Sequence, residues 1–67
     1  MNPHYAGTYF NLACLRSISK KEENKEEAFE FLRKAVELDS KYRDLAKTDA
    51  DLDFIRDDPR FKDIVGE

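Results

Sequence analysis

The chain has 67 residues, of which 40% are charged and 40% hydrophobic, and its formal net charge is −3 at pH 7. This length allows one small domain, and the mixture of both charge signs with a substantial apolar fraction indicates a folded domain rather than a disordered tail. The sequence has neither the basic stripe of a nucleic-acid-binding protein nor a run of about 20 apolar residues, so we expect no nucleic-acid partner and no membrane span.

The first predicted helix spans residues 4–19, with Asn2 as its N-cap and Pro3 at its first position. Apolar residues fall on two faces of this helix. One stripe consists of Tyr5, Tyr9, Leu12 and Ala13, and the second consists of Phe10, Cys14 and Ile18. A helix that is apolar on two faces is expected to have two neighbours.

Residues 20–27 form a charged run that is typical of a solvated turn followed by a helix start. Asn24 is the expected N-cap of the second helix, predicted over 24–39, and Glu27 completes a pattern similar to a capping box. The inward face of this helix consists of Ala28, Leu32, Ala35, Val36 and Leu38. Its outward face consists of Glu26, Glu30, Arg33, Lys34 and Glu37. The first two helices are therefore expected to pack as an antiparallel pair.

Short helical segments are predicted after residue 40. The first covers about 41–47, a second brief segment is capped by Thr48 or Asp49, and the last covers 59–65. Asp58 and Pro59 are a strong start signal for the last segment, which Gly66 ends. The apolar residues of these segments are Tyr42, Leu45, Ala46, Leu52, Phe54, Ile55, Phe61, Ile64 and Val65. With no alternating strand pattern, the predicted fold is all-α, with Leu12, Leu32 and Phe61 in its core.

Three stretches resemble a tetratricopeptide repeat: 11–15 (NLACL), 26–29 (EEAF) and 32–39 (LRKAVELD). Residues 42–61 are similar to the segment that closes many bacterial repeat arrays. The chain departs from the family pattern in three respects. Ser40 replaces a usual proline, Arg16 replaces a preferred tyrosine, and the turn between the paired helices is longer than the family norm.

The resemblance implies a single domain over 1–67, with a helix-turn-helix repeat at 4–40 and a capping segment at 41–67. It also implies a groove that binds a protein or peptide and is lined by residues of the first helix. The candidate partner-binding residues are Phe10, Asn11, Cys14, Ser17 and Ile18. Asn11 matches one position of the family's clamp for carboxylates, but the clamp draws on several repeats, and one asparagine does not make it.

Two classes of function fit this pattern. The first is a non-catalytic interaction module, either the C-terminal cap of a longer repeat array or a small adaptor. The second is a small regulatory or structural homodimer, in which the first helix pairs with its own copy. In either case we expect Phe10 or Ile18 to stay partly exposed and to dominate partner binding.

No catalytic, cofactor or metal site is predicted from the sequence. Asp49, Asp51 and Asp53 alternate as in a calcium loop, but the glycine and glutamate that such a loop requires are replaced by Phe54 and Arg60. These acids are therefore interpreted as a capped, acidic helix start.

Cys14 is the only cysteine, so no internal disulfide can form. Without a neighbouring base in the sequence, it is predicted to be buried filler. His4, the only histidine, is expected to have no functional role. The first residues lack the features of a signal peptide, so we expect a cytoplasmic location.

Overall fold

The computed structural model describes residues 5–66, which form α-helices and two 3₁₀ turns and include no strand. The α-helices are α1 (Ala6–Ile18), α2 (Lys25–Leu38), α3 (Lys41–Thr48), α4 (Asp53–Arg56) and α5 (Pro59–Val65). The 3₁₀ turns are η1 (Glu22–Asn24), which leads into α2, and η2 (Ala50–Leu52), which leads into α4. The predicted all-α class is confirmed. None of the described helices is long and apolar enough to cross a membrane.

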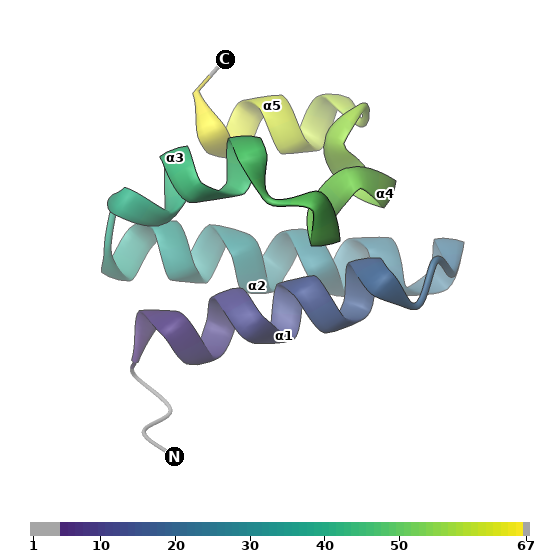
Figure 1. Ribbon diagram of the computed structural model, residues 1–67, viewed down its shortest axis with the longest axis horizontal. Helices are drawn as coiled ribbons and strands as arrows, with labels where there is room; N and C mark the ends of the chain where they lie inside the picture. The colour runs from purple at the N-terminus through teal and green to yellow at the C-terminus, as the bar shows by residue number, and fades with distance from the viewer. Residues whose placement is uncertain (1–4, 67) are drawn as a thin grey trace.

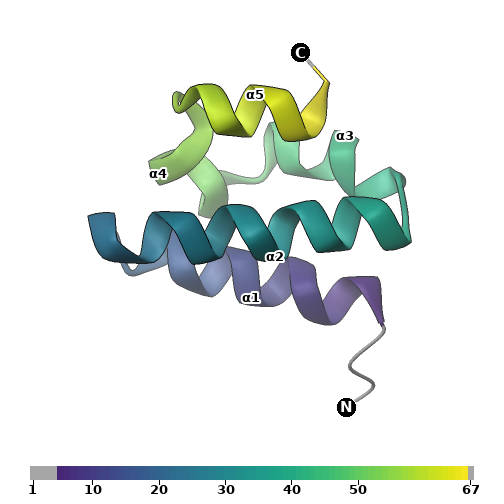
Figure 2. The same cartoon turned by 180° about the vertical axis from the view of Figure 1, so that it is seen from behind.

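The two long helices lie side by side and run in opposite directions (Figure 1). The shorter helices α3, α4 and α5 pack on the other side of α2, as the view from behind also shows (Figure 2). The C-terminal segment also reaches α1, because the ring of Tyr42 on α3 lies 4.9 Å from the ring of Phe10. On another side of α1, the ring of Tyr9 lies 6.3 Å from that of Phe31 on α2. The second neighbour that the two apolar stripes predicted for the first helix is therefore the C-terminal segment.

Helix ends in the C-terminal half follow local sequence signals. The Asp58 carboxylate accepts a hydrogen bond from the Arg60 amide at 2.9 Å, with Pro59 at the first helical position. Gly66 ends α5 in the left-handed conformation, with φ of 79°. The Asp49 carboxylate caps η2 by accepting from the Asp51 amide at 2.9 Å. These three predicted signals are confirmed.

The predicted capping box at the start of the second helix is wrong. Asn24 is the last residue of η1, and its side chain makes no capping hydrogen bond. The side-chain nitrogen Nδ2 of Asn24 instead donates to the Ser19 hydroxyl at 2.9 Å, across the turn between α1 and α2. Because the chain enters α2 through a 3₁₀ turn, Asn24 already has helical backbone angles and cannot take the extended conformation of an N-cap. Asn2, Pro3 and His4 lie outside the described residues.

The core contains small residues where α1 and α2 approach each other and larger residues around them. Its fully or nearly fully buried members include Ala13, Ala28, Phe29, Leu32, Ala35, Ala46, Leu52, Ile55, Phe61 and Val65. Leu32 and Phe61 are buried as predicted, and Glu30, Lys34 and Glu37 are exposed as predicted. Leu12 is only partly buried, so its predicted core position is wrong. Phe10 and Leu12 are about 200° apart on the helix, and α1 turns Phe10 inward.

Candidate functional site

The five candidate partner-binding residues do not form a continuous groove in the described structure. Phe10, Cys14 and Ser17 are buried, whereas Asn11 and Ile18 are exposed. The expectation of a groove that includes the three buried residues is therefore corrected. Phe10 packs against α3, and Cys14 faces the connection between α3 and α4, so the C-terminal segment covers this part of the stripe. Ile18 at the end of the stripe is 51% exposed, so the prediction that Phe10 or Ile18 stays partly exposed is confirmed by Ile18.

The exposed part of α1 includes two of the five candidates together with Leu15, and we call it the outer α1 face, defined by Asn11, Leu15 and Ile18. Leu15 is 57% exposed and Ile18 is 51% exposed. At 100° per residue the three positions fall within an arc of about 60°. They therefore form one surface strip, with an amide beside two aliphatic side chains.

Leu15 belongs to neither of the apolar stripes from which the sequence analysis assigned inward positions. The signal that could have found it is its spacing: it lies four residues after Asn11 and three before Ile18, which places it beside both on a helix. An exposed leucine outside the core-facing stripes is a candidate for contact with a partner molecule.

Side-chain contacts with α2 help to fix the orientation of α1. The Arg16 Nε donates to the Glu27 carboxylate at 3.2 Å. The guanidinium of Arg16 also lies 5.8 Å from the centre of the Phe31 ring. These contacts lie on the flank of α1 that faces α2, so they hold the outer α1 face turned away from that helix.

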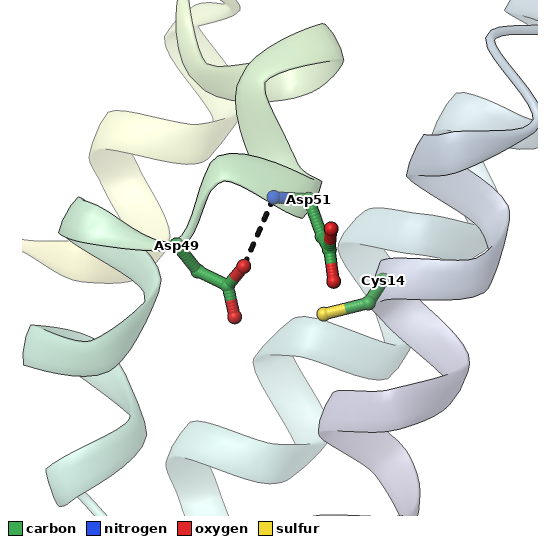
Figure 3. Close-up of side chains that lie close together, drawn as sticks. All are labelled: Cys14, Asp49 and Asp51. Carbon is green, nitrogen blue, oxygen red and sulfur yellow. Dashed lines mark hydrogen bonds between the residues drawn. The ribbon is translucent and has the colours of Figure 1, made fainter.

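A second group of residues brings together side chains that are far apart in the sequence. The sulfur of Cys14 on α1 and one carboxylate oxygen each of Asp49 and Asp51 lie within 4.8 Å of one another (Figure 3). Burial, with smaller contributions from the charges of Asp49 and Asp51, raises the pKa of the Cys14 thiol from 9.0 to about 11. The thiol is therefore protonated at neutral pH and is a poor nucleophile.

The third alternating acid does not join this group. Asp53 forms an ion pair with Arg56, one turn later on α4. The same guanidinium donates to the main-chain oxygens of Ala46 at 3.1 Å and of Asp49 at 2.5 Å. The interpretation of the three acids as a capped, acidic helix start is confirmed, because Asp49 caps η2, Asp51 lies in the first turn of η2 and Asp53 begins α4. The proximity of Asp51 to Cys14 is an additional, tertiary feature.

The described surface also contains two clefts among α2 and the C-terminal helices. One, of about 380 Å³, is lined by Arg33, Val36, Glu37, Arg43, Asp63 and Ile64. The other, of about 190 Å³, is lined by Lys47, Arg56, Phe61 and Lys62. The first has balanced charges, and in the second Lys47 and Arg56 are paired with Asp44 and Asp53. The lining of the second cleft also includes Lys62 and no acidic residue.

Comparisons of the chain with protein-family models, with curated proteins and with solved structures each found no match. The resemblance to a tetratricopeptide repeat therefore stays an interpretation that depends on the residues of this chain.

Proposed function

We propose that the chain is a non-catalytic interaction module that binds an amphipathic helix of a protein partner through the outer α1 face. The observation that carries this proposal is the exposure of Leu15 and Ile18 on neighbouring turns of one helix. Complete burial of a fully exposed side chain of this kind is worth about 1.5–3 kcal/mol. Since Leu15 and Ile18 are about half exposed, a partner that covers both gains about 1.5–3 kcal/mol in total from them.

A helix suits this face because the two aliphatic side chains form a short ridge along α1. Ridges of this kind pack into the groove of a facing helix at an interaxial distance of about 8–10 Å. The Asn11 amide, exposed on the same strip, offers a polar contact that would fix the register of the partner. A repeat unit that neighbours this one, an adaptor's target and a second copy of the chain can all supply such a helix.

The asymmetry of the domain supports the capping role that the sequence resemblance implies. The C-terminal helices cover one side of the α1–α2 pair, whereas the outer α1 face is bare in the described structure (Figures 1 and 2). Terminal units of repeat arrays are typically closed on one side and packed against a neighbour on the other.

The test uses a displayed library of amphipathic helical peptides, selected against the purified full chain. We expect selected peptides to shift the amide resonances of α1 around Leu15 and Ile18. Leu15→Glu should weaken binding of the best peptide about tenfold, since it removes about 1–1.7 kcal/mol of apolar contact and places a charge in the contact. The matched control is Leu45→Glu on α3, because Leu45 is 47% exposed and lies on a different element.

Sedimentation velocity over a range of concentrations shows whether the bound helix belongs to another protein or to a second copy of the chain. A monomer that binds selected peptides supports a partner or a neighbouring repeat. A dimer that Leu15→Glu dissociates, and Leu45→Glu does not, supports the homodimer. The proposal is wrong if no peptide is selected and the chain stays monomeric, or if peptides bind equally well to both variants.

A further inference from the structure

The outer α1 face differs from the rest of the described surface because its side chains carry no charge. Although 40% of all residues in the chain are charged, α1 contains one charged residue, Arg16, which pairs with Glu27 at 3.2 Å. The outward face of α2, by contrast, is exposed and charged over Glu26, Glu30, Arg33, Lys34 and Glu37. Because charged residues are depleted at the centre of protein–protein interfaces, the outer α1 face favours an uncharged partner surface.

The ring of Tyr5 extends this uncharged surface at the N-terminal end of α1. Tyr5 is 63% exposed, and a Cβ at position 7 would lie 2.9 Å from its Cε2 atom. The ring therefore lies over Gly7, where the missing side chain leaves room for it. Gly7 and Asn11 are four residues apart and so share one side of the helix. The uncharged surface thus runs from the Tyr5 ring through Asn11 to Leu15 and Ile18.

Asn11 lies at the middle of this surface. Gly7, which the Tyr5 ring covers, is four residues before Asn11, and Leu15 is four residues after it. At 1.5 Å per residue, each end is about 6 Å from Asn11 along the helix axis. A second copy of α1 that runs in the opposite direction therefore matches this surface at three points. Its Tyr5 ring meets Leu15, its Leu15 meets the Tyr5 ring, and its Asn11 meets Asn11.

We infer that the helix bound at the outer α1 face is α1 of a second copy of the chain, packed antiparallel about a two-fold axis at Asn11. This dimer rests on the proposed function, of which it names the partner. Both copies use the same residues, as in any isologous contact. An asparagine side chain holds both a donor and an acceptor, so the two Asn11 amides can donate to each other across the axis. An asparagine within a helix–helix contact is a known means of fixing register and the number of chains.

The fold leaves room for this contact but limits its size. In both views α1 forms one edge of the domain, and α2 and the C-terminal helices lie on its other sides (Figures 1 and 2). The contact involves one helix of 13 residues, which is about 20 Å long. Stable complexes bury about 1,200–2,000 Å², which is more than one such helix pair provides. We therefore expect a weak dimer that exchanges with the monomer.

The first experiment is sedimentation equilibrium of the full chain over a wide range of concentrations. We expect a reversible monomer–dimer equilibrium. Leu15→Glu should weaken dimerisation at least about tenfold, because each dimer contains the substitution twice and both charges would be placed in the contact. Tyr5→Ala should also weaken it, since the ring faces Leu15 of the other copy. The matched control is Leu45→Glu, at an exposed leucine of α3, which should leave the equilibrium unchanged.

The second experiment tests the direction of the two helices by disulfide cross-linking under mild oxidation. Cys14→Ala first removes the only native cysteine. In that background Asn11→Cys places two cysteines at the axis, within the Cα–Cα distance of about 4.4–6.8 Å that a disulfide requires. The two Leu15 positions are about 12 Å apart along the antiparallel pair, so Leu15→Cys should not cross-link. A parallel pair would cross-link at both positions.

The inference is overturned if the chain stays monomeric, if Leu15→Glu dimerises as well as the wild type, or if Leu15→Cys cross-links as readily as Asn11→Cys. A monomeric chain that binds selected helical peptides around Leu15 and Ile18 overturns the dimer and leaves the proposed function intact. A chain that neither dimerises nor binds such peptides overturns both, so the two failures are distinguishable.

Discussion

The rings of Phe10 and Tyr42 lie 4.9 Å apart with an angle of 36° between their planes, and this contact joins the first half of α1 to the start of α3. Aromatic pairs at such distances contribute about 0.5–1.5 kcal/mol beyond their buried area. Because Phe10 is held in this pair, α1 cannot present it to a partner unless α3 moves away. Phe10 therefore stabilises the fold, whereas Ile18 at the other end of the same stripe stays exposed.

Phe10→Ala is expected to destabilise the domain by about 3–5 kcal/mol, since it deletes a buried ring. In a chain this small such a loss is comparable to the whole free energy of unfolding. Urea denaturation followed by circular dichroism measures it. Ile18→Ala serves as the comparison, because this exposed side chain should change stability by no more than about 0.5 kcal/mol. Equal effects of the two substitutions would contradict the orientation of α1.

Leu32→Ala is expected to lower the free energy of unfolding by about 2–5 kcal/mol. Leu32 is fully buried between the two layers of helices, so truncation leaves a cavity. The matched variant is Leu45→Ala, which removes the same atoms from an exposed position. A thermal melt that Leu32→Ala leaves unchanged would show that the register of α2 is wrong.

Ser17→Ala is expected to leave the stability of the domain unchanged or to raise it by about 1 kcal/mol. Ser17 is buried, and its hydroxyl has no hydrogen-bond partner among the described residues. Burial of an unsatisfied hydroxyl is costly, and alanine also favours the helix. Chemical denaturation of both proteins in parallel checks this. A loss of more than about 1 kcal/mol would mean that the hydroxyl has a partner in solution.

The Asp58 carboxylate should titrate well below the ordinary range. Its hydrogen bonds from the side chain and the amide of Arg60, together with the charge of Arg60, lower its pKa from 3.8 to about 2. Since the folded-state pKa is the lower one, the stabilisation is present above pH 3.8 and is lost as the pH falls toward 2. NMR titration of the side chain gives the pKa directly. Arg60→Ala should move it back toward 3.8, and an unchanged value would exclude Arg60 as the cause.

Cys14 should react slowly with thiol reagents in the folded protein and rapidly in urea. Its pKa is raised from 9.0 to about 11 by burial and by Asp49 and Asp51, so the thiolate is scarce at neutral pH. By linkage, this group contributes stability below pH 9 that is lost as the pH rises toward 11. Labelling kinetics in metal-free buffer measure the difference. Equal rates in the folded and unfolded states would contradict the burial of the thiol.

The sequence was most informative where a signal is local. The last helix was predicted over 59–65 and is found there, because a cap, a proline and a terminal glycine each act within a turn of the residue that they mark. Asn24 has the residue type of a cap as well. It does not cap α2, because the 3₁₀ turn η1 precedes the helix and includes Asn24. The sequence of η1 has no cap, proline or glycine that would predict such a turn.

The candidate site was harder to predict because it depends on the rotation of α1 about its own axis. The spacing of apolar residues gives two stripes but does not say which one the C-terminal helices cover. That choice is made by the packing of Tyr42 on Phe10, a contact between residues distant in sequence. The proximity of Cys14 to Asp49 and Asp51 (Figure 3) was also not predictable from spacing, because it arises where the connection between α3 and α4 packs against α1.

The hydrogen bonds of Arg56 to the oxygens of Ala46 and Asp49 have a consequence for how tightly the chain can bend. The last carbonyls of a helix have no amide from a following turn to accept, and a sharp bend normally leaves them to water. Here the Arg56 guanidinium donates from the far side of the bend to the Ala46 oxygen, and also to the Asp49 oxygen, which accepts from the Leu52 amide as well. The chain can therefore stop one helix, reverse and start another within a few residues while its inner carbonyls stay satisfied. Nη2 of Arg56 donates to both carbonyl oxygens while Nη1 pairs with the Asp53 carboxylate. A lysine at position 56 has a single nitrogen and cannot divide these contacts between two, so the bend and the start of α4 are tied together by arginine itself.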